Sequence, residues 1–233
     1  MKAIIFDAGP VISLTLNNLL WLLDPLKKQF RGEFYITPGV YNELVNKPLL
    51  TKKYKFEALQ ILPYISRGIL KLVSNDEIKL LTTQLLEKIN KTFKANGNWI
   101  TIVHLGEIES IATALHFDSK NIAIDERTSR KLIEDPDSIA HTLSKKLHTK
   151  ITINQDNLGY IKKELGHLKV IRSTELAVVA YKTGLLARYM LEDERKIIKD
   201  LNTAVLEGVL WGIKLNGCSI KREEIYKMIK YVV

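Results

Sequence analysis

The chain has 233 residues, of which 46% are hydrophobic and 26% charged, a composition typical of a soluble globular protein that buries a sizeable core. Its net charge of +9 favours polyanionic partners, nucleic acid first and an anionic membrane second, although a merely solvated basic surface would give the same charge. The single cysteine, Cys218, excludes a disulfide within the chain and a cysteine-based zinc site.

Two apolar stretches near the start fit neither an export signal nor a membrane span. The first follows Lys2, but Asp7 and Pro10 interrupt it too early for a secretory signal. The second, residues 16–26, is too short and too polar to cross a bilayer. We therefore expect a cytoplasmic protein that does not enter a membrane.

Short apolar runs alternate with segments of helical periodicity along the first half of the chain. Pro38 suits the first turn of a helix, and Asn75 or Asp76 is the expected N-cap of another. The pattern predicts strands at residues 2–6, 33–37 and 68–74, and helices at 11–30, 38–45, 53–63 (ended by Pro63) and 75–93.

The second half continues this alternation. Residues 94–101 are polar and contain glycine, which indicates a loop. Beyond about residue 189 the only strand signal is the weak run at 230–233. The pattern predicts strands at 121–125, 149–153 and 168–173, and helices at 104–117, 128–147 (broken near Pro136), 156–165 and 174–188.

This alternation predicts the fold class. Strands separated by helices form a mostly parallel sheet with helices on both faces, an α/β three-layer sandwich. We assign residues 1–187 to this domain and residues 188–233 to a helical C-terminal extension.

Four acidic residues share one context, the end of a predicted strand or the start of the helix that follows it. Because the carboxyl ends of parallel strands lie at one edge of a sheet, these side chains can meet in one pocket. Each candidate has an alternative interpretation. Asp7 could be a helix N-cap and Glu43 a solvated residue. Glu109 could take the place of Glu107, and Glu126 the place of Asp125. The four candidates are Asp7, Glu43, Glu107 and Asp125.

Carboxylates that converge in this way point to a divalent cation. Close negative charges repel, and some would remain protonated at neutral pH. Mg²⁺ or Mn²⁺ removes that penalty, prefers oxygen ligands and can activate a water for attack on a phosphodiester. The basic excess of the chain would then hold a polyanionic substrate.

Four segments, IIFDAGPVISL, ITPGVYNELV, HLGEIESIATAL and IAIDERTSRKL, resemble in this order the motifs of PIN-domain proteins. The nearest resemblance is to a prokaryotic PIN-like group with a Gly-Glu-x-Glu signature, here residues 106–109, and residues 170–186 resemble its last strand and helix. The resemblance covers about residues 1–187. It implies a PIN-like α/β sandwich and a Mg²⁺- or Mn²⁺-dependent ribonuclease, and some members are toxins of toxin–antitoxin pairs.

The resemblance also implies roles for single residues. It makes Asp7, Glu43, Glu107 and Asp125 the catalytic metal ligands, with Glu109 as an alternative ligand or a supporting residue. Ser173 and Thr174 would hydrogen-bond near the site. Arg127, Arg130 and Lys131 would bind the RNA, although they could instead pair with Glu126.

The chain departs from the family pattern in four places. Glu107 stands where aspartate is more frequent in the family, which places the carboxylate one methylene farther out. Gly9 stands where many members have serine or threonine, and a missing hydroxyl there would weaken support for the metal ligands. Residues 136–167 are longer than a compact PIN domain needs, which indicates an insertion, and the C-terminal helices match no motif. A catalytically weak nucleic-acid-binding or assembly module is therefore the alternative to a nuclease.

The opening AIIFDAG also resembles haloacid-dehalogenase-type phosphatases. Their chemistry needs a second acid two residues after the aspartate, and this position is Gly9 here. No later lysine with an acidic pair compensates, so we set this interpretation aside.

Some features outside the motifs bear on partners. Trp99 either stacks on a base or anchors a loop, and the basic segment 141–150 either touches phosphate or is a solvated helix face. His104 precedes the Glu107 helix, as a site residue or as a cap. Leu206, Val209, Leu210 and Ile213 form an apolar stripe that either dimerises or covers the core. The expected partners are RNA, a protein antitoxin and a second copy in a homodimer.

Overall fold

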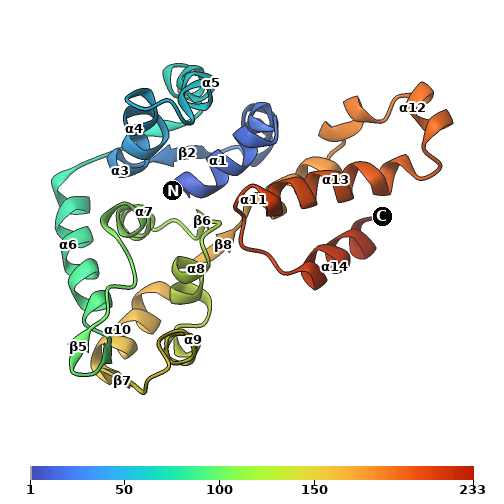
Figure 1. Ribbon diagram of the computed structural model, residues 1–233. Coiled ribbons are helices and arrows are strands. Elements are labelled where there is room, and N and C mark those ends of the chain that lie inside the picture. Colours follow the sequence, from blue (N-terminus) through green and yellow to red (C-terminus); the bar gives the residue numbers. More distant parts are fainter. Residues whose placement is uncertain (1) are drawn as a thin grey trace.

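The computed structural model describes residues 2–233 and consists of a parallel sheet between two helical layers, with a small second sheet and a helical C-terminal part (Figure 1). The main sheet contains β1 (Ala3–Phe6), β2 (Glu33–Ile36), β3 (Lys71–Leu72), β6 (Asn121–Ala123) and β8 (Lys169–Ile171). The second sheet contains β4 (Phe93–Ala95), β5 (Asn98–Trp99) and β7 (Ile151–Ile153).

The helices before the last strand of the main sheet are α1 (Ala8–Leu16), η1 (Leu20–Leu22), α2 (Leu23–Phe30), α3 (Pro38–Tyr41), η2 (Asn42–Asn46), α4 (Lys47–Leu49), α5 (Lys55–Ser66), α6 (Asp76–Asn90), α7 (Leu105–His116), α8 (Arg127–Glu134), α9 (Asp137–Leu147) and α10 (Gln155–Leu165). The helices after it are α11 (Ser173–Lys182), η3 (Leu185–Tyr189), α12 (Glu192–Ile197), α13 (Leu201–Leu215) and α14 (Arg222–Val232). Within residues 2–233, no helix is long and apolar enough to cross a bilayer.

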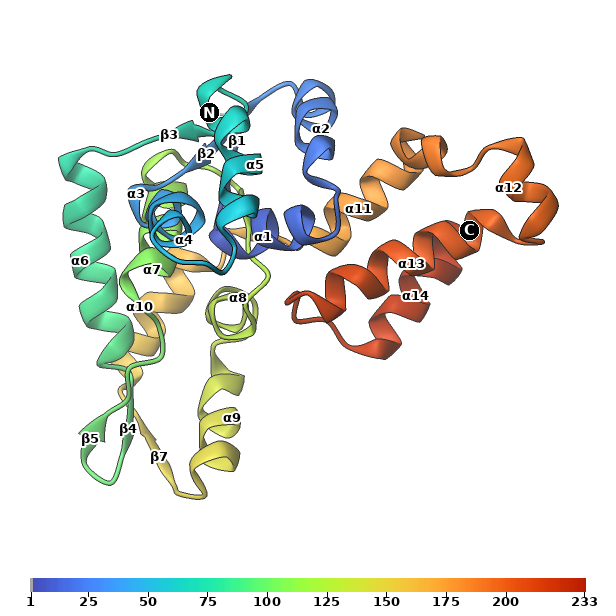
Figure 2. The ribbon, with the colours of Figure 1, turned by 45° about the horizontal axis from the view of Figure 1, so that its top comes forward.

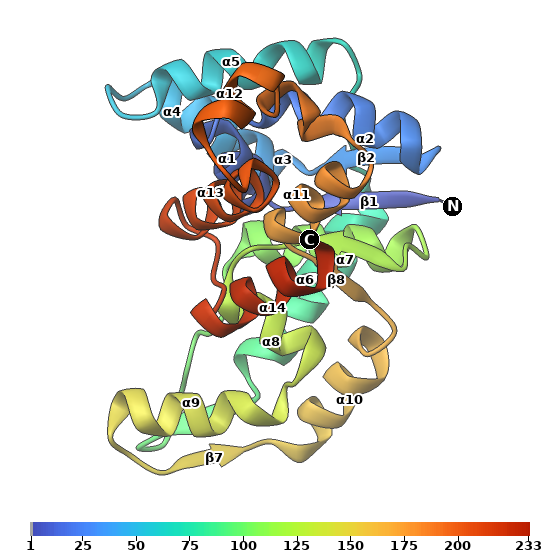
Figure 3. The same ribbon diagram turned by 90° about the vertical axis from the view of Figure 1, so that its right-hand side faces the viewer.

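The two helical layers follow from the alternation of side chains along β1. Ile4 and Phe6 point into one core, with α1, α2, α5, α11 and α13, while Ala3 and Ile5 point into the other, with α6, α7, α8 and α10. Figure 3 shows α5 toward the top of the view and α8 and α10 toward the bottom, with β1 between them. The α/β three-layer sandwich expected from the sequence is therefore confirmed.

The strand order of the main sheet is β3-β2-β1-β6-β8, and its strand pairs are parallel. The chain first builds outward from β1 to β2 and β3, then returns to add β6 and β8 on the other side. The carboxyl ends of β1 and β6 therefore flank the point at which the winding reverses, where open α/β sheets bind ligands.

Four local predictions were wrong. The helix expected to end at Pro63 continues through it to Ser66 as α5, although the proline ring nitrogen cannot donate the usual helical hydrogen bond. Residues 94–101 are not a loop: β4 and β5 form a hairpin whose turn, Asn96-Gly97, has φ angles of +50° and +81°. The helix expected over 11–30 is divided into α1, η1 and α2, because Asn18 adopts a left-handed conformation. The weak strand signal at 230–233 belongs to the end of α14.

The stripe on α13 belongs to the core of its own chain. Leu206, Leu210 and Ile213 are fully buried together with α1 and α11, and Val209 is partly buried beside them. Figure 2 shows α13 and α14 lying together at the edge of the sandwich, with the exposed helix α12 farther out. The stripe covers the core, so the expectation of a homodimer loses this support and stays a prediction.

Candidate active site

Asp7 begins the site because it directly follows β1 at the reversal of the winding. Its backbone N–H donates to the carbonyl of Ala123 at 2.9 Å, which ties it to the end of β6. Asp7 occupies the N-cap position of α1, but its side chain closes no capping hydrogen bond. A role as helix N-cap alone therefore does not explain why a carboxylate stands at this position.

The charge state of Asp7 reflects its surroundings. Burial raises the pKa of Asp7 to about 7, against the lowering effect of the Ala8 backbone, and the charges of Glu43 and Glu107 raise it further. The two glutamates therefore act on Asp7 electrostatically although they come from other elements. A cation among these groups would relieve the repulsion.

Asp125 lies two residues after β6 and is held by hydroxyl groups. Ser13 and Ser173 donate their hydroxyls to its Oδ2 at 2.7 and 2.6 Å, and the Ser173 backbone N–H donates to Oδ1 at 2.8 Å. The carboxylate is 2% exposed, so these bonds offset the cost of burying it. They also fix its orientation.

Glu107 reaches the site from the first turn of α7. Its Oε2 accepts a hydrogen bond of 2.7 Å from the backbone N–H of His104, so it also closes the capping box of this helix. Burial raises the pKa of Glu107, against the lowering effect of the His104 backbone, and the charge of Glu126 adds to the rise. Glu126 itself caps α8 by accepting from the Ser129 N–H at 2.7 Å.

Glu43 is presented by a π-helical turn. The ring of Pro48 excludes the normal helical hydrogen bond to the Leu44 carbonyl. The Lys47 N–H instead reaches back to the carbonyl of Asn42, which widens the backbone into η2. This single π turn carries Glu43, a setting in which functional residues are often found.

Glu109 ties α7, which carries Glu107, to α3, which directly precedes the π turn that carries Glu43. Its Oε2 accepts a 2.7 Å hydrogen bond from the Gly39 N–H in the first turn of α3. A Cβ at position 39 would lie 2.7 Å from the same oxygen, so only glycine allows this approach. Glu109 therefore acts as a clamp between α7 and α3, and it is absent from the pocket lining.

One pocket of about 570 Å³ contains all four predicted carboxylates. Among residues 2–233, however, no three histidine, cysteine, aspartate or glutamate side chains stand close enough to hold a metal ion as they are. The pocket is lined by Asp7, Gly9, Gly39, Asn42, Glu43, Lys47, His104, Leu105, Gly106, Glu107, Asp125, Glu126 and Gly217.

The donor set of this pocket fits a hard divalent cation. Its acidic groups are carboxylates, the ligands that Mg²⁺ and Mn²⁺ prefer, and Mg²⁺ keeps several waters that can bridge to more distant oxygens. The raised pKa of Asp7 marks a place where negative charge is under-compensated. Lys47 is the one lysine or arginine among the described residues that line the pocket, and it makes no salt bridge within the described part of the chain.

The residues expected to bind RNA lie elsewhere. None of Arg127, Arg130 and Lys131 lines the pocket. Arg130 donates to the Ser219 carbonyl at 3.0 Å, and Lys131 donates to the Thr142 hydroxyl at 2.7 Å. Thr174 likewise turns away from Asp125 and donates to Glu175 at 3.1 Å.

Ser13 is the residue that the sequence interpretation missed. It lies four residues after Gly9, one turn farther along α1, and supplies a hydroxyl to Asp125. A Cβ at position 9 would lie only 3.2 Å from the Cβ of Asp125, so Gly9 permits the close approach of α1. The sequence contains one signal for Ser13: it lies four residues after Gly9 and therefore on the same face of the helix.

The C-terminal part also contributes to the pocket wall. Gly217 lines the pocket, and the Ser219 N–H donates to the Asp125 carbonyl at 3.2 Å. Between them, Cys218 is 3% exposed, and burial together with the charge of Asp125 raises the pKa of its thiol to about 12. The thiol is therefore neutral at physiological pH and unsuited to act as a nucleophile.

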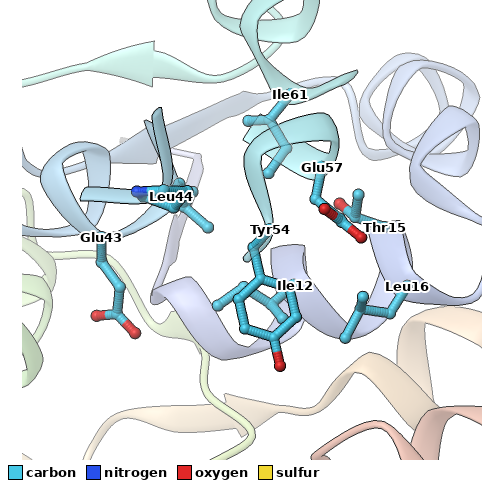
Figure 4. A pocket seen from close by; sticks show the side chains of 9 residues that line it. Ile12, Thr15, Leu16, Glu43, Leu44, Tyr54, Glu57 and Ile61 are labelled. Carbon is cyan, nitrogen blue, oxygen red and sulfur yellow. The ribbon is translucent and has the colours of Figure 1, made fainter. Parts of the chain in front are cut away.

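Glu43 borders a second, smaller pocket of about 50 Å³ between α1 and α5 (Figure 4). Its other walls include Ile12, Leu16, Tyr54 and Ile61. In the close view the Glu43 carboxylate points away from these side chains. The acid therefore belongs to the larger pocket.

The comparison with known families agrees with this geometry. Residues 3–137, more than half of the chain, match a family described as a PIN domain. The chain therefore belongs to the PIN-domain family, a superfamily of nucleases whose members generally depend on divalent metals. No curated protein and no solved structure has significant similarity to the chain.

Proposed function

We propose that this protein is a Mg²⁺- or Mn²⁺-dependent ribonuclease that hydrolyses phosphodiester bonds. The observation that carries the proposal is the convergence of Asp7, Glu43, Glu107 and Asp125 on one pocket at the reversal of the sheet winding. The basic net charge of the chain supports a polyanionic substrate.

The protein groups have separate roles in this proposal. Asp125, fixed by Ser13 and Ser173, would hold the cation together with Asp7, whose charge is destabilised by burial and, to a lesser extent, by the neighbouring acids. Glu107 and Glu43 would complete the ligand set from α7 and η2. When bound, the metal would activate a water and stabilise the charge that develops on the phosphate.

Arg127, Arg130 and Lys131 lie on α8, which starts directly after Asp125 and Glu126. We keep them as proposed RNA contacts outside the pocket, with Lys47 as an additional candidate that lines it. A toxin role with a protein antitoxin is a special case of the same activity and rests on the resemblance alone.

The direct test is cleavage of single-stranded RNA by the purified protein with Mn²⁺. We expect cleavage by the native protein and none by Asp7→Asn. Glu57→Gln is the matched control, because Glu57 lines the small apolar pocket that Glu43 borders but not the larger pocket that holds the four carboxylates. Equal cleavage by the native protein and Asp7→Asn would contradict the proposal and indicate a contaminating nuclease.

A PIN-like binding module without catalysis is the second candidate. It is favoured by the separation of the carboxylates, which as they stand form no three-ligand cluster within residues 2–233, and by Gly9 in place of a hydroxyl residue. Titration calorimetry separates the two functions. Heat of Mn²⁺ binding that disappears in Asp7→Asn supports the nuclease, and no heat with a correctly folded protein supports the binding module.

A further inference from the structure

The β5-β4-β7 sheet brings together two segments that contain no acidic residue. Residues 88–106 and 138–155 lack aspartate and glutamate, and each contains three lysines. Far apart in the sequence, they become neighbours because β4 pairs with β7 in an antiparallel register, Lys94 opposite Thr152. The result is a locally cationic surface at the end of the molecule that carries β5, β7 and α9 (Figure 1).

The pleat of this sheet separates an apolar face from a polar one. Phe93 is fully buried, and Ile151 and Ile153 pack against the same core. On the opposite face the register aligns Lys94 with both Trp99 and Thr152. We give the name lysine ribbon to this outer face together with the exposed lysines of the adjoining α9–β7 segment, Lys145, Lys146 and Lys150.

Trp99 is the exposed aromatic residue of the lysine ribbon. The Lys94 ammonium lies 3.9 Å from the centre of the indole, yet Trp99 remains 41% exposed. A loop anchor would be covered by its surroundings, whereas an exposed indole beside a cation resembles the stacking platforms of proteins that bind single strands.

No acidic side chain of the described chain forms a salt bridge with the lysines of the ribbon, whose ammonium groups therefore keep their charge for an external anion. Within residues 2–233, Lys94, Lys145, Lys146 and Lys150 form no salt bridge. The flanking acids do not neutralise them, since Glu87 pairs with Lys91 and Asp137 with Lys162. Asp156, at the start of α10, forms no salt bridge with a ribbon lysine.

The ribbon is also connected to the carboxylate pocket. Trp99 is separated by only four residues from His104, which lines the pocket. Even a fully extended chain limits this separation to roughly 18 Å. One strand of nucleic acid can therefore contact both places.

We propose that the lysine ribbon is a binding surface for single-stranded nucleic acid, in which the lysines contact phosphates and Trp99 stacks on a base. This inference rests on the proposed function only for the choice of RNA as the physiological ligand. It assigns substrate capture to a surface separate from the carboxylates, and it predicts that capture does not need the metal.

The first test measures binding of an end-labelled oligouridylate by fluorescence anisotropy in EDTA, where no metal-dependent cleavage occurs. The variant Lys145→Gln, Lys146→Gln, Lys150→Gln removes three ribbon charges. The control Lys199→Gln, Lys227→Gln, Lys230→Gln removes three charges from exposed lysines of the C-terminal part that also lack salt bridges in the described chain.

We expect the ribbon variant to bind about tenfold more weakly and its logarithmic salt slope to be shallower by about 2, because each lost phosphate contact removes roughly 0.7 from the slope. The control should stay within about twofold of the native protein. Equal weakening of both variants would overturn the proposal, since it would show that net charge alone attracts the RNA.

The second test addresses Trp99. Stacking predicts that Trp99→Ala loses about tenfold or more in affinity while Trp99→Phe retains most of it. Oligouridylate should quench tryptophan fluorescence in the native protein but much less in Trp99→Phe. The control is Tyr231→Ala, which removes another exposed aromatic ring beside a lysine, Lys182. Unchanged affinity of Trp99→Ala would contradict the stacking role.

Two further binding measurements distinguish a surface for single-stranded nucleic acid from a surface for duplex RNA or for a membrane. Duplex RNA should bind more weakly than the single strand because its bases cannot reach the indole. Binding to phosphatidylserine vesicles without binding to oligouridylate would overturn the proposal in favour of a membrane surface. Ribbon-dependent binding in a protein that never cleaves RNA would refute the nuclease function alone, and cleavage unaffected by the ribbon variants would refute the ribbon alone.

Discussion

At the scale of single residues, the site combines two different carboxylates. The negative charge of one is destabilised by its surroundings, whereas the other is stabilised by hydrogen bonds. Asp7 has a pKa raised to about 7 by burial and by neighbouring acids. Asp125 instead accepts hydrogen bonds from Ser13 and Ser173. This difference leads to two predictions, one on stability and one on metal-supported activity.

Asp7→Asn should stabilise the metal-free protein at about pH 8. The pKa of Asp7 is 3.8 in the unfolded chain and about 7 in the folded protein. Between these two values the folded state binds more protons than the unfolded state, so the native protein loses stability as the pH rises from 3.8 to about 7. Above that range the penalty is constant and amounts to a few kcal/mol, at about 1.4 kcal/mol for each pKa unit. Urea unfolding in EDTA measures it.

The control for this experiment is Asp156→Asn, which neutralises an exposed acid at the start of α10. The control should leave the stability within about 0.5 kcal/mol of the native protein. If Asp7→Asn were as unstable as the native protein at about pH 8 and equally sensitive to pH, the electrostatic strain on Asp7 would be refuted.

Ser173→Ala should lower Mn²⁺-supported cleavage by about 10- to 100-fold, because the residues that orient metal ligands contribute effects of this size. The variant removes the 2.6 Å hydroxyl bond to Asp125 and keeps the backbone bond. Ser110→Ala is the control, since this buried hydroxyl contacts only the backbone of its own helix. In a Mn²⁺ titration of activity, Ser173→Ala should need a higher Mn²⁺ concentration to reach half of its maximal rate. Equal activity of the two variants would count against the positioning role.

At the scale of elements, the site depends on how helices are tied to one another. The π turn carrying Glu43 begins directly after α3, and α3 is clamped to α7 by the bond from Gly39 to Glu109. Sequence reasoning placed Glu109 beside the site but could not decide its direction, because residues two apart on a helix face different neighbours.

Glu109→Ala should destabilise the protein by about 1–3 kcal/mol, because it leaves the Gly39 N–H without its charged acceptor. Glu109→Gln keeps an oxygen acceptor and should lose less. Thermal unfolding measures both, with Glu87→Ala as the control at an exposed helix position. A loss of Mn²⁺ binding in Glu109→Gln without a loss of stability would instead make Glu109 a ligand.

The elements that could be predicted were those with a repeating apolar signal. The strands β1 and β6 end just before Asp7 and Asp125 as expected, because a buried parallel strand needs a continuous apolar run. The β4–β5 hairpin was missed although Asn96-Gly97 is a strong turn signal, since the strands it joins are short and polar. The π turn depends on Pro48, and its effect on Glu43 is visible only in the backbone.

At the scale of the whole molecule, the C-terminal helices are part of the structure that forms the site. Sequence periodicity identified the stripe on α13 but could not determine what covers it, because an apolar helical face looks the same at a dimer interface and in a core. The packing resolves this: α13 shares its core with α1 and α11, and the following loop reaches Asp125 and the pocket.

An ion pair links this C-terminal part to the sheet. Arg172, which directly follows β8, pairs with Glu224 on α14 at 2.7 Å and also binds Glu175. Burial opposes ionisation of Glu224, but the hydrogen bond and charge of Arg172 outweigh it and keep the pKa of this carboxyl below its ordinary value. The stabilisation is therefore present above the ordinary pKa of glutamate and is lost as the pH falls through the lower value in the folded protein.

Glu224→Gln should weaken this link across the whole molecule. We expect a loss of about 1 kcal/mol at neutral pH, because the pair is partly exposed. Hydrogen exchange should become faster in α14 and in the loop with Gly217 and Ser219, while β1 and β6 remain protected. The control is Glu223→Gln, which removes a neighbouring exposed carboxylate. If exchange in the loop is the same in both variants, the ion pair does not hold the pocket wall in place.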